Sequence, residues 1–216
     1  MILREFSATF DRPISNRRKE FEEKSRSILS SASRLIGNKV RTDDYWKIRL
    51  AINSRNQQQH LKVVGGVLNY CASCDEEDFF QQDVDDQKEW MLGFLRSSLI
   101  AAFHDCGIDC TQLDLLGEFV RERQFTSVFL GPKSSSGKRS AQVRCEQGFE
   151  TCEVYVAITE GLEEIEKVHL TTTTPSEFAF NIFLKELSWT SYNKLELATS
   201  LGDSYAIDLD RANERP

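Results

Sequence analysis

The chain has 216 residues, of which 40% are hydrophobic, including 14 Phe, so it has enough apolar surface for a real core and is not a disordered chain. No run of about 18 apolar residues could span a membrane, and Arg4 and Glu5 interrupt the apolar start that a signal peptide needs. We therefore expect a cytoplasmic protein with no membrane partner, whose six cysteines are reduced thiols.

The net charge of −7 is spread unevenly along the chain. Residues 1–50 hold 12 Lys and Arg against 7 Asp and Glu, whereas residues 75–89 hold eight acids and one base, Lys88. Such an acidic field repels nucleic acid and attracts basic partners. The basic N-terminal segment interleaves acids at i,i+4 spacing, such as Glu20 with Lys24, so we expect no nucleic-acid partner there either.

The first elements follow from the spacing of apolar residues. Alternation predicts a strand over 2–10, and helical spacing predicts a helix after Pro13 that ends before Gly37. The stretch YWKIRLAIN alternates and predicts a second strand. The following HLKVVGGVLNY fits either a helix or a hairpin around Gly65-Gly66, and both interpretations stay open.

Two helices are expected next. Asp86 with Glu89 three residues on predicts an N-terminal cap for a helix through Phe103, which is apolar over most of its circumference. Gly107 would end it. A shorter helix follows, with Thr111 as its N-cap.

The second half of the chain is typical of a β-meander, because short runs rich in β-branched and aromatic residues are separated by polar turns. Thr174-Pro175 then predicts a helix through Trp189, and a terminal hairpin turns at Gly202-Asp203. We expect an α+β fold, a single domain over 1–210 with a mostly antiparallel sheet (C-terminal meander and hairpin) packed against several helices. Residues 211–216 would form a frayed polar tail.

The stretch FLGPKSSSGKRS resembles a phosphate-binding P-loop but does not match it. Five residues separate Gly131 from Gly137 where the motif has four, and Arg139 replaces the hydroxyl that binds magnesium. The residues that follow alternate as a strand, whereas a P-loop leads into a helix. We predict a hairpin tip and no nucleotide cofactor.

Other chemical motifs are weak. The spacing of Cys71, Cys74, Cys106 and Cys110 allows a zinc set, but their irregular separation favours small core residues, so no metal is expected. The histidines at 60, 104 and 169 lack a convincing catalytic neighbour. We therefore predict no catalytic residues and no cofactor.

These observations favour a protein-binding module, such as an acidic inhibitor or an immunity-type protein. It would dock a basic protein partner through six carboxylates of the acidic segment, residues 75–89. An enzyme with a dispersed active site and a zinc-stabilised structural or adaptor protein are the alternatives. The proposed contact residues are Asp75, Glu76, Glu77, Asp78, Asp83 and Asp85.

Overall fold

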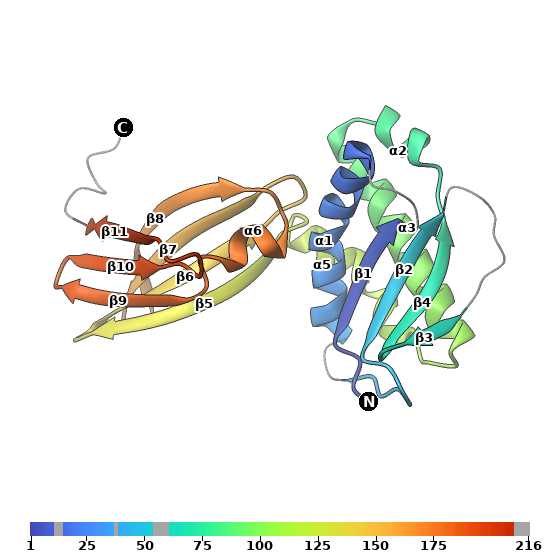
Figure 1. The fold of residues 1–216 in the computed structure, drawn as a ribbon, viewed down its shortest axis with the longest axis horizontal. Coiled ribbons are helices and arrows are strands. Elements are labelled where there is room, and N and C mark those ends of the chain that lie inside the picture. Colours follow the sequence, from blue (N-terminus) through green and yellow to red (C-terminus); the bar gives the residue numbers. More distant parts are fainter. Residues whose placement is uncertain (11–14, 37–38, 54–60, 210–216) are drawn as a thin grey trace. The chain divides into compact units, whose positions relative to one another are not determined.

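The computed structural model describes the chain except for residues 11–14, 37–38, 54–60 and 210–216, so the predicted tail lies outside the described residues. The described residues form six helices and eleven strands in three sheets, which confirms the α+β class. They divide into two compact units, Met1–Ser127 and Val128–Pro216 (Figure 1). The expected single domain over 1–210 stays a prediction, which the cooperativity of unfolding would test.

The N-terminal unit is built on a four-stranded sheet in the order β1-β2-β4-β3. The predicted strands near both 2–10 and 45–53 are confirmed. β1 pairs with β2 and β2 with β4 in parallel, and only β3 runs antiparallel. The strands are β1 (Glu5–Phe10), β2 (Lys47–Asn53), β3 (Lys62–Val64) and β4 (Val67–Ser73).

The segment that fitted either a helix or a hairpin forms the β3–β4 hairpin. Gly65 and Gly66 have φ values of 58° and 76°, and a two-residue type I′ turn needs positive φ at both positions. A Cβ on Gly66 would lie 2.9 Å from the Trp46 ring, so a side chain would also be too close to it. The backbone requirement of this turn therefore decided between the two interpretations.

Helices cover one face of this sheet. α1 (Asn16–Ile36) and α3 (Val84–Asp105) are the long ones, and Figure 1 shows them on the same side of the strands. The buried residues of β1 meet them: the Phe10 and Phe21 rings are 5.4 Å apart, and those of Phe6 and Phe103 are 6.0 Å apart. The alternate burial along β1 and β4 thus shows which face of the sheet is the core face.

The predicted start of α3 at Asp86 is wrong. Asp83 caps this helix, and its carboxylate accepts from the backbone N–H groups of Asp85 and Asp86. A further short helix, α2 (Glu76–Gln81), was not predicted, and Asp75 caps it in the same way. Several aspartates in this stretch could serve as caps, so composition alone did not identify the two that do.

The predicted N-cap of the next helix is also wrong by one residue. Two short helices stand here, α4 (Thr111–Asp114) and α5 (Leu116–Glu122), and the cap of α4 is Cys110. Thr111 instead donates its N–H and its hydroxyl to Asp109, at 2.9 and 2.5 Å. The hydroxyl thus contacts a side chain and not the helix backbone.

The C-terminal unit begins with the predicted meander, which is confirmed. Four strands pair in sequence order, and the β5–β6 turn holds Gly137 at a φ of 60°, so the P-loop-like stretch is a hairpin tip. The strands are β5 (Ser127–Ser136), β6 (Arg139–Gln147), β7 (Cys152–Glu160) and β8 (Glu163–Thr173).

The predicted helix through Trp189 is wrong, because α6 spans only Glu177–Asn181 and Ser176 is its N-cap. Leu187 and Trp189 instead belong to a strand and pair with Leu197 and Leu195. The terminal hairpin is confirmed, and this extra strand joins it in a three-stranded sheet. Its strands are β9 (Glu186–Ser191), β10 (Lys194–Ala198) and β11 (Ser204–Asp208).

The two sheets of this unit share a core of buried residues from β6, β7, β9, β10 and β11. Near β5 and β9 the sheets are held together, because the Trp189 indole N–H donates to the Ser134 carbonyl at 3.3 Å. β8 and β11 are the terminal strands of their sheets at the other side. The sandwich is therefore joined along one side and bounded by two free edges along the other.

Candidate binding groove and predicted site residues

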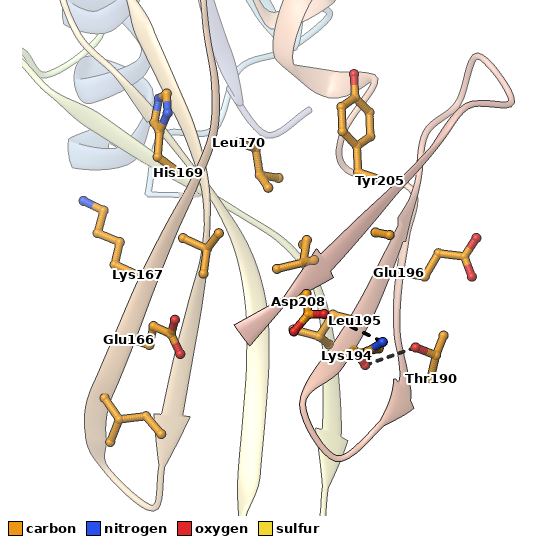
Figure 2. A pocket seen from close by; sticks show the side chains of 14 residues that line it. Glu166, Lys167, His169, Leu170, Thr190, Lys194, Leu195, Glu196, Tyr205 and Asp208 are labelled. Carbon is orange, nitrogen blue, oxygen red and sulfur yellow. Dashed lines mark hydrogen bonds and ion pairs between the residues drawn. The ribbon is translucent and has the colours of Figure 1, made fainter. Parts of the chain in front are cut away.

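A groove of about 990 Å³ lies between the two edge strands β8 and β11 (Figure 2). Residues of β9 and β10 complete it. Its volume is at the upper end of the range for small-molecule sites. The lining residues are Ile165, Glu166, Lys167, Val168, His169, Leu170, Thr190, Lys194, Leu195, Glu196, Tyr205, Ala206, Ile207 and Asp208.

Apolar side chains line the middle of the groove. Leu195 and Ile207 are buried in the core, whereas Ile165 is 44% exposed and Tyr205 is 39% exposed. The Tyr205 ring lies 5.7 Å from that of Phe183, which fixes its position against the core. The groove thus offers a buried apolar base and two exposed apolar side chains that a ligand could cover.

The two edge strands differ in regularity. β11 pairs with β10 without interruption. β8 pairs with β7 through two register shifts, which leave Leu170 and Ile165 as extra residues on β8. Bulges of this kind twist an edge and re-aim side chains, and here both extra residues line the groove.

The charged residues at the groove mostly have partners. Lys194 lies 3.7 Å from the Asp208 carboxylate. Lys167 points away from Leu170 (Figure 2), toward Glu146 at 3.3 Å and over the ring of Tyr155. Burial, and then the hydrogen bond to Glu146, raise the pKa of Tyr155, so this phenol stays protonated.

His169 forms the strongest cluster of polar side chains near the groove. Its Nε2 lies 2.8 Å from the Glu153 carboxylate and 3.3 Å from the Thr172 hydroxyl, which itself donates to Glu153 at 2.8 Å. A relay that activates a hydroxyl needs one ring nitrogen for the hydroxyl and the other for the carboxylate. Here a single nitrogen meets both groups, so the cluster has the residue types of a triad without its geometry.

A second histidine belongs to the N-terminal unit. His104 is exposed near the end of α3 beside Asp105, and residue 60 lies outside the described residues. No group of three or more His, Cys, Asp or Glu within the described ranges is placed to hold a metal ion.

The acidic segment is not a loop. Residues 76–81 form α2 with Asp75 as its N-cap, and the other acids lie at the start of α3. Arg18 binds the Glu76 carboxylate through two contacts, of 2.7 and 3.0 Å, while Arg17 and Glu77 form a longer, exposed pair at 3.4 Å.

Two further acids of the segment also have basic partners within the chain. Lys88 pairs with Asp85 at 2.8 Å, and Arg121 donates hydrogen bonds to the Glu89 carboxylate from both its Nε and an Nη. The hydrogen bond from Arg121 lowers the pKa of Glu89. Half of the eight carboxylates therefore contact cations of the same unit.

The other four acids have no ion pair with a residue that the structure describes, and all four are exposed. Asp75 and Asp83 cap the two helices, and Asp78 accepts from the Trp90 indole at 3.0 Å. Asp86 lies in the first turn of α3, where the helix dipole favours a negative charge. Asp83 and Asp86 thus lie at the junction of α2 and α3, Asp78 lies on α2, and Asp75 lies at the N-terminal end of α2.

Two cysteines of the possible zinc set, Cys74 and Cys106, lie toward different ends of α3, and among the described residues the set forms no metal-binding group. Cys74 precedes α2, whose Asp78 contacts Trp90 near the start of α3, while Cys106 caps the other end. A helix of 22 residues is about 33 Å long, whereas zinc ligands lie within about 2.3 Å of the ion. The structure therefore does not bring these cysteines together.

The expectation that the cysteines are small core residues holds for a different pair. Cys145 and Cys152 are fully buried, whereas Cys71, Cys74, Cys106 and Cys110 are half-buried. Burial raises the pKa of Cys74 to about 12, helped by the carboxylates of Glu76 and Asp75 and opposed by Arg18. A high pKa disfavours the thiolate that redox chemistry requires.

The groove was not predicted from the sequence. Both of its strands were anticipated, but they are far apart along the chain and belong to different sheets. The one local signal was the exposed apolar side chain of Ile165 between acids, since a solvated edge strand rarely needs one.

No protein-family description, curated protein or solved structure gave a significant match to this chain. Within the described residues, none of the helices has the length and apolar character that a membrane span requires.

Proposed function

We propose that this protein is a protein-binding module, and that its C-terminal unit binds an extended peptide in the groove between β8 and β11. The observation that carries the proposal is the groove itself, since both walls are edge strands. An edge strand presents unpaired backbone N–H and C=O groups, which an incoming strand can pair with. The peptide would add a strand to a sheet, and its side chains would fill the apolar centre.

β11 is the edge that would receive the peptide. Its register with β10 is regular, so its outward backbone groups keep the even spacing that a partner strand needs. The two bulges of β8 interrupt that spacing. β8 would then form the opposite wall, and its extra residues Ile165 and Leu170 would contact the peptide side chains.

The groove also restricts the chemistry of the peptide. Every second residue of a bound strand would face Tyr205 and Leu170, so apolar residues are expected at alternate positions. The C-terminal unit from residue 128 onward holds 9 Lys and Arg against 14 Asp and Glu, a net charge of −5. Lys or Arg at the ends of the apolar stretch would therefore speed association.

The test begins with peptides selected from a random library on the full chain. Affinity of a selected peptide is then measured by calorimetry for Ile165→Lys and Tyr205→Lys, both at exposed groove positions. We expect each change to weaken binding by about ten-fold or more, or roughly 1.4 kcal/mol. The matched control is Leu162→Lys, which adds the same charge at a fully exposed position in the β7–β8 turn outside the groove.

NMR distinguishes strand addition from other modes of binding. Cross-strand contacts between the peptide backbone and β11 amides are expected in the bound state. Selected peptides that bind equally well to both lysine variants, or that show contacts to β8 alone, would contradict the proposal.

A second function remains a candidate because four exposed acids of α2 and the start of α3, including the N-caps of both helices, have no cationic partner in the described chain. We propose that this surface docks a basic protein, as an inhibitor or immunity-type protein would dock a basic enzyme. Charges of this kind mainly raise the association rate, and salt screens their effect.

The structure refines how this surface should be tested. Asp75 and Asp83 cap helices and Glu76 binds Arg18, so changing them would mix stability with binding. Asp78→Asn with Asp86→Asn removes two charges and keeps an acceptor for Trp90. A Lys-rich peptide should then associate more slowly with this double variant than with the wild type. The ratio of the two association rates should be closer to one at high salt.

The control changes Glu118 and Glu122, two exposed acids of α5, to Gln and removes the same charge elsewhere in the unit. An equal loss in both double variants would mean that only net charge matters and that the acids of α2 and the start of α3 form no specific site.

A further inference from the structure

The face of the N-terminal sheet that turns away from the helices is polar. In β1 the buried Phe6, Ala8 and Phe10 face the helix layer, so the residues between them face the other way. The same alternation holds in β2 and β4. The half-buried side chains that the three strands place on this face include Glu5, Ser7, Thr9, Lys47, Arg49, Asn53, Asn69 and Cys71.

Three of these residues form one row across three strands. Ser7 pairs with Arg49, and Arg49 pairs with Asn69, so the three side chains are direct neighbours on this face. The Ser7 Oγ, the Arg49 Nε and the Asn69 Oδ1 are all shielded from solvent, and none has a hydrogen-bond partner. In the adjacent row, Glu5 and Lys47 form an ion pair with each other.

The orientation of the Asn69 amide is defined. Its Nδ2 donates to the carbonyls of Lys62 and Val67, at 3.1 and 3.3 Å, so its Oδ1 is the group left without a partner. Arg49 has no ion pair in the described part of the chain. The row therefore presents a cationic donor, a hydroxyl and an amide acceptor together.

Shielded polar groups without partners cost free energy, and native structures contain few of them. Three in one row form a place where a bound ligand would supply the missing partners. An Arg fork binds a carboxylate through two parallel hydrogen bonds, and a serine hydroxyl can donate to the same group. Asn69 Oδ1 needs a donor as well, which an inorganic anion does not carry but a peptide N–H does.

We propose that the Ser7–Arg49–Asn69 row docks an acidic residue of a protein partner. The carboxylate of an Asp or Glu would bind Arg49 and Ser7, and a backbone N–H of the same segment would donate to Asn69. The charge of this sheet face favours such a partner, since Lys47 and Arg49 stand on it against Glu5, which gives these three residues a net positive charge. The site belongs to the N-terminal unit and does not depend on the groove.

The experiment uses the full chain, and its probe is the blocked peptide Ac-Gly-Glu-Gly-Glu-Gly-amide, with the Gln-for-Glu version as its matched control. Arginine side-chain and backbone NMR signals are followed during titration. We expect saturable shifts at Ser7, Arg49 and Asn69 with the Glu peptide, and binding weaker by about ten-fold or more with the Gln peptide.

Variants identify the residue responsible. Arg49→Leu should weaken binding by about ten-fold or more, while Arg41→Ala, which removes an exposed arginine outside the sheet strands, should leave it unchanged. Arg49→Leu should not lower the melting temperature, because Arg49 loses no partner. If that variant fails to fold, Arg49→Lys keeps the charge without the fork and should weaken binding by about five-fold.

Equal binding of the Glu and Gln peptides, or unchanged binding by a folded Arg49 variant, would overturn the proposal. Inorganic sulfate provides a further arm: if it produces the same shifts at Asn69 as the Glu peptide, the row is a general anion site and the assignment to a protein partner is wrong.

Discussion

The two units use their β-sheets in opposite ways. The N-terminal unit covers one sheet face with helices and leaves side chains such as Arg49 on the other, whereas the C-terminal unit packs two sheets face to face and leaves strand edges beside a groove. A sheet face recognises a partner through side-chain chemistry, and a sheet edge recognises it through backbone hydrogen bonds. One chain can therefore offer both kinds of surface when each unit has its own core.

The largest expected effect tests whether the two cores are independent. Phe21 is fully buried and its ring contacts those of Phe10, Phe79, Trp90 and Phe94, so Phe21→Ala should destabilise the N-terminal unit by about 3–5 kcal/mol. Calorimetry should show one transition moving to lower temperature while a second stays in place.

The matched variant is Phe180→Ala, a fully buried Phe of the C-terminal core that packs against Phe129. It should move only the other transition. A single transition that shifts in both variants would mean one cooperative domain, as the sequence predicts, and would end the comparison of independent units.

The cysteines of the two units differ in burial, so their alkylation rates also compare the two units. In the native protein at pH 8, iodoacetamide should label the half-buried Cys106 and Cys110 faster than the buried Cys145 and Cys152 by about ten-fold or more. Cys74 should react more slowly than Cys106, because its pKa is raised to about 12. Peptide mass mapping over time measures each rate, and early labelling of Cys152 would show that the C-terminal core opens readily.

A smaller effect is expected at the α1–α2 contact of the N-terminal unit. The guanidinium of Arg18 binds Glu76 through two contacts and lies 5.0 Å from the Phe10 ring centre, and its side chain is only 17% exposed. Arg18→Ala should therefore cost about 1 kcal/mol in denaturant unfolding. Arg17→Ala is the control, since its pair with Glu77 is exposed on both sides and should contribute almost nothing.

The smallest effect concerns acid stability of the C-terminal unit. Burial raises the pKa of Glu153, but hydrogen bonds from Thr172 and His169 outweigh it, so the net shift is downward. A lowered carboxyl pKa contributes stability above the unfolded value of about 4.3, and this contribution is lost as the pH falls through the folded value.

Unfolding free energies at pH 5 and pH 3 should therefore differ less in Glu153→Gln than in the wild type, by a few tenths of a kcal/mol, because solvent screens this exposed cluster. If the variant and the wild type show the same difference in unfolding free energy between pH 5 and pH 3, the cluster around His169 is not coupled to folding.

Local patterns predicted most of the elements but not all of their types. The meander was predictable because four strand-like stretches follow one another and three short turns separate them. The stretch after α6 was misread, since Phe180, Phe183, Leu184 and Leu187 also fit helical spacing. Pairing with β10 decided the outcome, and nothing local in the sequence reports that pairing.

The candidate sites were less predictable than the fold. The acidic segment was found from charge density, but its contacts with Arg17, Arg18 and Arg121 depend on helices that are distant along the chain. The row through Arg49 depends on strand register, and the groove depends on which strands end their sheets. Both properties follow from tertiary pairing and have no local sequence signal.

The indole of Trp189, which donates a hydrogen bond to Ser134, is a fluorescent probe within the C-terminal unit. Of the three tryptophans, Trp46 and Trp90 belong to the N-terminal unit and Trp189 is the only one after residue 128. Replacing Trp46 and Trp90 by Phe would leave a single indole, at the side of the sandwich where β5 and β9 are joined. Its fluorescence emission would shift to longer wavelength when water reaches the indole. A single fluorescence measurement would therefore report the separation of the two sheets.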